Sequence, residues 1–139
     1  MGEIKVRAEL ENFVDRYLFA ENKIKENEIR KHSVDGIVDT GAVMLILPQD
    51  VVEKLGLKIL RKVVVKYADE RKEERPVAGT VTIKIGDRFM NSDCVVGPPL
   101  SEPLIGQIIL EELDLIADCQ NQTLKTRPES PIYPLLNLK

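Results

Sequence analysis

The amino-acid sequence predicts a mainly β fold with one or two short helices. Its 139 residues include 16 Leu, 14 Val and 13 Ile against 3 Phe, 3 Tyr and no Trp. The core is therefore expected to be aliphatic and rich in β-branched side chains, which favour strands. The apolar runs are short and many end at turn-forming residues, a spacing that gives about seven strands. The length fits one domain covering residues 1–139.

The first half of the chain contains two predicted strands and one predicted helix. Residues 3–10 alternate charged and apolar side chains, which is the period of a strand with one exposed face. Residues 33–39 form a second, more apolar strand. Pro48 suits the first position of a helix that Gly56 ends. Residues 11–31 are polar and charged and give no firm prediction.

The second half contains a predicted hairpin and several short elements. Residues 60–68 and 76–85 are typical of strands and flank the charged stretch 69–75, a pattern that predicts a long hairpin projecting from the body. The elements expected after it are a strand at 88–96, a helix at 107–113, strands at 115–118 and 123–125, and a proline-containing tail at 128–139. The tail ends in apolar residues, which suggests that it packs against something.

Composition and charge argue against several classes of function. A net charge of −3, from 20 Lys and Arg against 23 Asp and Glu, gives no broad basic face for nucleic acid. No apolar run approaches the roughly 18 residues of a membrane span. His32, Cys94 and Cys119 lack the spacing of zinc ligands, so no metal is expected. Two cysteines without a signal segment favour the cytoplasm, and both are expected to be small buried side chains.

The segment most informative about function is Ile37-Val38-Asp39-Thr40-Gly41-Ala42. An ionisable side chain directly after two apolar strand residues is costly to bury unless hydrogen bonds satisfy it. The hydroxyl of Thr40 can join the loop to a neighbouring segment, and Gly41 lets its backbone N–H approach the carboxylate closely. Taken alone, the tripeptide Asp-Thr-Gly is more often an ordinary turn at the end of a strand.

In its context, this segment resembles the signature of the retropepsin-like (retroviral-type) aspartic proteases, specifically their small prokaryotic members. Residues 37–42 match it one by one: two apolar residues, then Asp-Thr-Gly-Ala, then an apolar stretch. The family has a second element beneath the catalytic loop, two apolar residues and a glycine before a short helix. Leu104-Ile105-Gly106 is similar to it, and Gly106 lies 67 residues after Asp39. The resemblance implies a closed acid-protease barrel with one lobe per chain.

The resemblance implies an aspartic endopeptidase, a hydrolase in which two facing carboxylates share one proton and activate a water molecule. That chemistry requires no cofactor. The chain supplies one Asp-Thr-Gly, and Asp35, the nearest other acid, is expected to be solvated. The implied catalytic pair is therefore Asp39 from each chain of a homodimer. Thr40 is implied to hydrogen-bond across the dimer, and Gly41 to direct its N–H toward the carboxylate.

The resemblance also implies roles for residues around the loop. The hairpin at about 67–79 is the implied flap, which closes over an extended peptide or unfolded protein. The implied substrate contacts are Ala42, Tyr67, Ala68, Asp69 and Ile105, and the implied structural supports are Leu104 and Gly106. The tail at 128–139 is expected either to enter a sheet between the two subunits or to add a strand to its own body.

Two features depart from the viral relatives and support an alternative hypothesis. Viral flap tips are glycine-rich and apolar, whereas residues 69–75 are all charged. Gln107 stands where those relatives usually have an arginine that braces the dimer. The alternative is a non-catalytic dimerisation or peptide-binding module on the same fold. The intact Asp-Thr-Gly-Ala favours the protease, because a site without catalytic demand has no physical need for a buried carboxylate facing its own copy.

Overall fold

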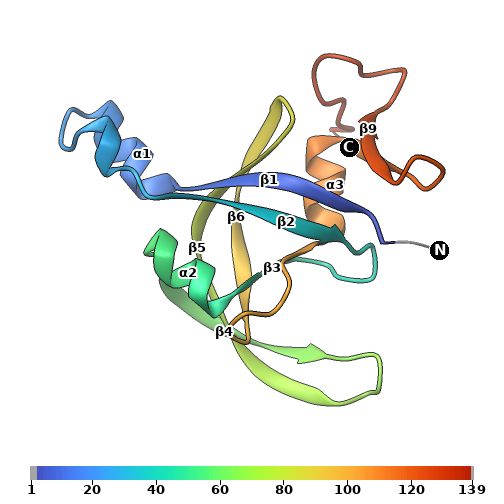
Figure 1. Ribbon diagram of the computed structural model, residues 1–139, viewed down its shortest axis with the longest axis horizontal. Coiled ribbons are helices and arrows are strands. Elements are labelled where there is room, and N and C mark those ends of the chain that lie inside the picture. The colour runs from blue at the N-terminus through green and yellow to red at the C-terminus, as the bar shows by residue number, and fades with distance from the viewer. Residues whose placement is uncertain (1–2, 139) are drawn as a thin grey trace.

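The computed structural model describes residues 3–138, and its architecture is mainly β, as the sequence predicts (Figure 1). In chain order the elements are β1 (Lys5–Asn12), α1 (Phe13–Ala20), the 3-10 helix η1 (Glu26–Glu28), β2 (Lys31–Val38), β3 (Leu45–Pro48), α2 (Gln49–Leu55), β4 (Lys58–Lys66), β5 (Lys72–Ile85), β6 (Arg88–Gly97), β7 (Leu104–Ile105), α3 (Gln107–Leu113), β8 (Leu115–Asp118) and β9 (Thr123–Thr126). The predicted helices correspond to α2 and α3, and α1 is an addition within 11–31. Pro48 precedes α2 as its N-cap, one position before the predicted place.

The strands β1 to β7 form one sheet in the order β1-β2-β7-β3-β6-β5-β4. β1 also pairs with β5, so the sheet returns on itself as a ring of six strands, and β4 lies outside the ring. The short strand β7 runs parallel to β2, and β3 runs parallel to β6. These pairings bring the end of β2 beside residues 104 and 105, which are distant in the sequence.

One cluster of buried aliphatic side chains joins the strands to α2 and α3. Its fully buried members include Leu10, Leu45, Leu47, Leu55, Ile83, Ile105, Ile109 and Leu113. Burial of each side chain of this size contributes about 1.5–3 kcal/mol. Cys94 is buried among them, as predicted, whereas the prediction for Cys119 is wrong because that residue lies in the exposed turn between β8 and β9. Within residues 3–138, no helix is long and apolar enough to cross a membrane.

The polar segment between β1 and β2 is ordered by caps and ion pairs. Asn12 ends β1 and caps α1, because its side chain accepts a hydrogen bond from the Asp15 N–H at 3.0 Å. The Asn12 amide also donates to the Leu55 carbonyl at 2.7 Å, which connects this segment to α2. The buried Asp15 carboxylate accepts from the Arg30 backbone N–H and guanidinium at 2.9–3.0 Å. These hydrogen bonds lower the pKa of Asp15 below its ordinary value.

The C-terminal tail is held by a buried polar cluster at the end of α3. Asp114 ends this helix in the left-handed region, with φ 56°. Its Oδ1 accepts from Arg127 Nε at 2.6 Å, and its Oδ2 accepts from the Ser130 hydroxyl and, at 2.9 Å, from the Leu135 N–H. We call Asp114, Arg127, Ser130 and Leu135 the tail clamp. Buried Arg88 supports it by donating to the carbonyls of Leu113, Asp114 and Ser130.

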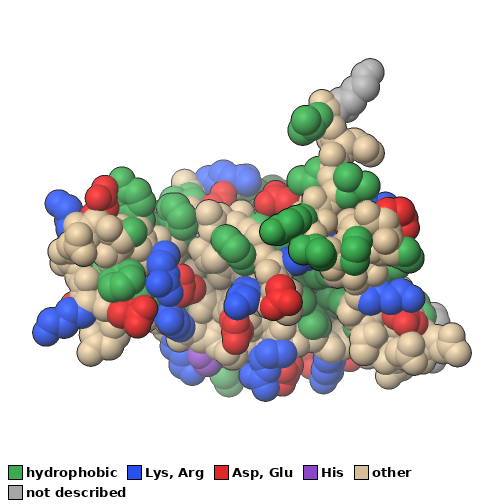
Figure 2. All heavy atoms as spheres, turned by 90° about the horizontal axis from the view of Figure 1, so that it is seen from above, with side chains coloured by type: hydrophobic (Ala, Val, Ile, Leu, Met, Phe, Trp, Pro, Cys, Tyr) green, Lys and Arg blue, Asp and Glu red, His purple; other side chains and the backbone are tan. Residues whose placement is uncertain are grey.

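The tail contains no strand between residues 127 and 138. The chain therefore does not add this segment as a strand to its own sheet. The other expectation, that the tail enters a sheet between two subunits, stays a prediction. Hydrophobic side chains gather beside the chain end in Figure 2. The exposed ones in this segment are Ile132, Tyr133, Leu135, Leu136 and Leu138.

We predict that the tail clamp weakens in acid. The hydrogen bonds from Arg127, Ser130 and Leu135 hold the pKa of the Asp114 carboxyl well below its ordinary value of 3.8. A carboxyl with a lowered folded-state pKa gives its full stabilisation above the unfolded-state pKa and loses it as the pH falls toward the folded-state value. The guanidinium unfolding midpoint should therefore fall more between pH 7 and pH 2.5 in the wild type than in Asp114→Asn. An equal fall in both proteins would contradict this prediction.

Candidate active site

Asp39 lies at the end of β2, where the chain leaves the sheet. Val38 pairs with Ile105 of β7, and the Asp39 N–H donates to the Ile105 carbonyl at 3.0 Å. The parallel pairing therefore fixes the backbone as far as the residue that carries the carboxylate. The Asp39 residue is half-buried, and Thr40 after it is exposed.

Residues 39–42 form a tight turn around this carboxylate. The Ala42 N–H donates to the Asp39 carbonyl at 3.1 Å, and the Gly41 N–H donates to Asp39 Oδ1 at 2.9 Å. A Cβ at position 41 would lie 3.2 Å from the same oxygen, so glycine gives the carboxylate room to accept this bond. Within residues 3–138, Asp39 Oδ2 accepts no hydrogen bond. One carboxylate oxygen is thus held by its own loop and the other is left to water or a neighbour.

The start of α3 holds the other side of the loop. The Gln107 N–H donates to the Ala42 carbonyl at 2.8 Å, and the Ile108 N–H donates to the Val43 carbonyl at 3.0 Å. The first N–H groups of a helix have no acceptor within the helix, so the loop carbonyls satisfy them. A Cβ on Gly106 would lie 2.7 Å from the Ala42 oxygen and 2.9 Å from the Val43 carbonyl carbon. The close contact between loop and helix therefore depends on the absence of a side chain at position 106.

The structure brings the two sequence motifs together but gives their members different environments. Leu104 pairs with Ile37, which places it beside the strand that leads to Asp39. Ile105 was expected to contact substrate, yet it is only 1% exposed, so in the single chain its position is one of core packing. Asp35 is exposed and lies 3.2 Å from the Arg7 guanidinium, which fits its expected solvated position.

β4 and β5 continue beyond the body as a hairpin whose tip is formed by residues 67–71 (Figure 1). The Tyr67 N–H donates to the Arg71 carbonyl at 2.8 Å, and the Arg71 guanidinium lies 4.5 Å from the centroid of the Tyr67 ring. Asp69 Oδ1 accepts from the Arg71 N–H at 3.0 Å. Ala68 and Asp69 are exposed and Tyr67 is half-buried. Within residues 3–138, no hydrogen bond joins this tip to the Asp39 loop.

Arg75 connects the hairpin to the body and is a residue that the sequence did not single out. Its Nε donates to the Val96 carbonyl of β6 at 2.9 Å, and its Nη1 lies 2.8 Å from Glu73 Oε1. Arg75 belongs to a stretch in which every residue is charged, so nothing in the pattern distinguishes it from its neighbours. The contact fixes where the hairpin leaves the ring of strands.

A groove lies beside the Asp39 loop, lined by Thr40, Gln107, Glu111 and the tail residues Leu135 and Leu136 among others. The Gln107 amide donates to Glu111 Oε1 at 3.0 Å on its own helix. The tail clamp thus brings apolar tail residues next to the exposed Thr40. In the described part of the chain, no three His, Cys, Asp or Glu side chains are grouped closely enough to hold a metal ion.

Comparison with known proteins gives one family match and a shared fold. Residues 26–112 match the family model described as gag-polyprotein putative aspartyl protease. The crystal structure of a retropepsin-like aspartic protease from Rickettsia conorii is similar, with a TM-score of 0.51 and 21% identity over 84% of this chain and 77% of that one. The retroviral protease-like domain of Ddi1 from Leishmania major has a TM-score of 0.55 and 13% identity over 99% of this chain and 92% of that one. No curated protein sequence matches. At these identities the two structures show that the mainly β fold is retropepsin-like.

We predict that Gly106→Ala disrupts the loop. Its new Cβ would meet backbone atoms of residues 42–44, which cannot move without breaking the hydrogen bonds to α3. The free energy of unfolding should fall by about 1–3 kcal/mol, measured by chemical denaturation. Gly36→Ala is the matched control, because its Cβ would crowd a side chain instead of backbone: Ile105 atoms would lie 2.8 and 3.0 Å away, and the nearest backbone atom, the Pro103 oxygen, 3.8 Å away. A loss at position 36 as large as that at 106 would contradict the role given to the backbone contact.

Proposed function

Because the chain belongs to the gag-polyprotein putative aspartyl protease family, we propose that it is a homodimeric aspartic endopeptidase that cleaves extended peptide. The family match spans the Asp39 loop, the β4–β5 hairpin and most of α3. The observation that carries the proposal is the Asp39 carboxylate, with Oδ1 bound by the Gly41 N–H and Oδ2 free of hydrogen bonds from residues 3–138. A carboxylate held in this way has one oxygen in a fixed position and one available for chemistry.

The second carboxylate comes from a second copy of the chain. The sequence contains a single Asp-Thr-Gly, and Asp35, the nearest other acid, is paired with Arg7 at the surface. A twofold axis beside the loop would place the two Asp39 side chains face to face, each contributed by the same surface of its own chain. Exposed Thr40 then hydrogen-bonds across the axis. In this assembly each 139-residue chain is a single domain that supplies half of the site.

The proposed reaction is hydrolysis without a cofactor. Two carboxylates in contact share one proton, so that one is ionised and the other is protonated. The ionised Asp39 takes a proton from a water molecule while the water oxygen attacks the peptide carbonyl carbon. The protonated Asp39 gives its proton to the carbonyl oxygen. Collapse of the tetrahedral intermediate breaks the C–N bond: the leaving nitrogen takes the proton that the first Asp39 received from water, and a hydroxyl proton of the intermediate returns to the other Asp39. The products are a carboxylic acid and an amine.

The proposed substrate is an extended peptide or unfolded protein held between the loop and the hairpin. Ala42 lies in the loop, and Tyr67, Ala68 and Asp69 lie at the hairpin tip, where they contact the bound peptide. An extended peptide presents backbone groups to both sides, as a strand does. We also propose a cytoplasmic location, on the basis of the two cysteines and the expected lack of a signal segment in the sequence.

The alternative is a non-catalytic dimerisation or peptide-binding module. The charged tip and the bond of Gln107 to its own helix favour it, because neither provides the apolar flap or the arginine brace of viral relatives. Sedimentation combined with peptidase assays separates the two. A dimer without activity between pH 3 and pH 7 favours the module, and a strict monomer at high concentration excludes the shared site.

We predict that Asp39→Asn abolishes peptidase activity toward an unstructured protein at mildly acidic pH. The variant should also inhibit the wild type when the two are mixed, because a hybrid dimer has only one aspartate. With nine parts of variant to one of wild type, activity per wild-type chain should fall to about a tenth, as random pairing gives. The assay follows release of peptides after refolding of the mixture.

Asp35→Asn provides the control for the mixing experiment. It removes the same charge from an exposed residue four positions away but keeps Asp39, so a mixture with the wild type should keep the activity per total chain unchanged. Activity in pure Asp39→Asn protein would refute the proposal. Inhibition by neither variant would show that the active site lies within a single chain.

A further inference from the structure

β4 leaves one backbone edge of the large sheet open. It stands at the end of the strand order and, in the described part of the chain, pairs only with β5. The pairing is irregular between Ile59 and Arg61 and regular from Arg61 to Lys66. At an open edge, alternate residues direct unpaired N–H and C=O groups outward, and these groups can bind another strand. β4 therefore offers six residues in regular register for strand addition.

The side chains along this edge give it a positive charge. β4 contains the basic residues Lys58, Arg61, Lys62 and Lys66 and no acidic residue. Within residues 3–138, Arg61 and Lys62 have no ion-pair partner within 4.0 Å. Lys66 lies 3.7 Å from Glu70, but both side chains are largely exposed, so this pair contributes little. Within residues 3–138 the positive charge of the edge is offset only in part, by Glu70 and by Glu74 of β5, which lies between Lys62 and Lys66 in the register.

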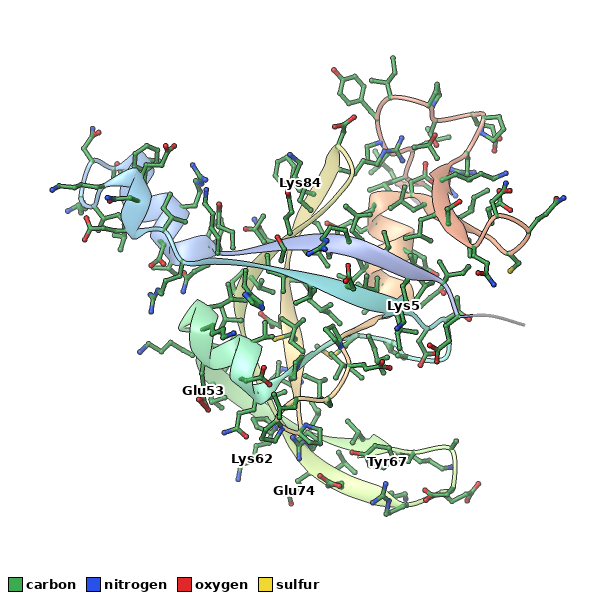
Figure 3. The ribbon with its side chains drawn as sticks, in the orientation of Figure 1. Lys5, Glu53, Lys62, Tyr67, Glu74 and Lys84 are labelled. Carbon is green, nitrogen blue, oxygen red and sulfur yellow. The ribbon has the colours of Figure 1, made fainter. Side chains whose placement is uncertain are left out.

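The outer face of β4 has a regular pattern of charge and apolar surface. Lys62, Val64 and Lys66 alternate along the strand and share one face, and all three are exposed. Val64 is 64% exposed, opposite Glu74 of β5. Lys62 and Glu74 extend outward from the hairpin in Figure 3. A neighbouring strand would meet two ammonium groups separated by one apolar side chain.

This pattern selects the partner by charge. Pairing with β4 of a second copy would bring basic side chains near basic side chains, and like charges on neighbouring strands are destabilising. An acidic strand would instead form cross-strand ion pairs. We propose that β4 binds, as an added strand, an extended polypeptide segment with acidic residues at positions i and i+4 and an apolar residue at i+2. Those three residues lie opposite Lys62, Lys66 and Val64.

This binding does not depend on the Asp39 chemistry. β4 lies on the hairpin, and its open edge contains none of the residues assigned to hydrolysis. In Asp39→Asn protein the peptide is bound without being cleaved, and the β4 variants below separate binding at the edge from binding between loop and hairpin. A failure of edge binding would leave the protease proposal untouched. The reverse also holds, because a protein without peptidase activity can still bind the acidic strand.

The test uses fluorescence anisotropy with Asp39→Asn protein and a labelled peptide, Thr-Glu-Thr-Val-Thr-Glu-Thr. The peptide should bind at low salt and more weakly at 0.5 M salt, because screening weakens exposed ion pairs. Replacing both glutamates by lysine should abolish binding. The double variant Lys62→Glu/Lys66→Glu should bind the acidic peptide about tenfold more weakly and gain affinity for the lysine peptide.

Two controls separate strand addition from general attraction. Lys5→Glu/Lys84→Glu makes the same change in net charge at exposed positions on β1 and β5, away from the β4 edge (Figure 3), and should leave affinity unchanged. A peptide of the same sequence with N-methylated backbone amides keeps its charge but cannot pair as a strand, and should not bind. Equal loss in both double variants, undiminished binding of the N-methylated peptide, or no binding of the acidic peptide would each overturn the proposal.

Discussion

The Asp39 loop depends on hydrogen bonds between two segments, in which the paired residues are 65 positions apart in the sequence. The loop has carbonyl groups without partners in a strand, and α3 has initial N–H groups without partners in a helix. Each set satisfies the other only because Gly106 has no side chain to separate them. The parallel pairing of β2 with β7 brings these segments together, so the sheet topology serves the geometry of one carboxylate.

Two kinds of interaction stabilise different parts of the molecule. Aliphatic packing holds the ring of strands and the inner faces of α2 and α3, whereas buried polar contacts hold the segments outside it. The ion pair of Asp15 with Arg30 orders the segment between β1 and β2, and the hydrogen bonds of Asp114 anchor the tail. A charged group removed from water must be matched by such partners. The polar clusters therefore determine where the peripheral segments lie, and the apolar core determines that the domain folds.

The strands and the loop were predictable because their signals are local. Alternation in residues 3–10, the apolar segment before Asp39 and the glycine before α3 each identify an element or a motif from adjacent residues. The ring was not predictable, since the pairing of β1 with β5 joins residues that are more than 60 positions apart. Nor were α1, Arg75 and the tail clamp, because their polar residues resemble those of a solvated loop until their partners are known. Burial of Ile105 follows from the same long-range packing.

β5 has three neighbours, β4 at the hairpin, β6 along its length and β1 at its far end. The β5 arm of the hairpin is therefore continuous with a strand of the core, and no loop separates the two. Movement of the tip requires this strand to bend or twist, and the register shift between Ala78 and Val81 in its pairing with β6 interrupts the ladder at an intermediate point. Displacement of the hairpin tip is therefore opposed by the pairing of β5 with β6 and β1, so the same hydrogen bonds that close the ring also limit how far the tip can travel.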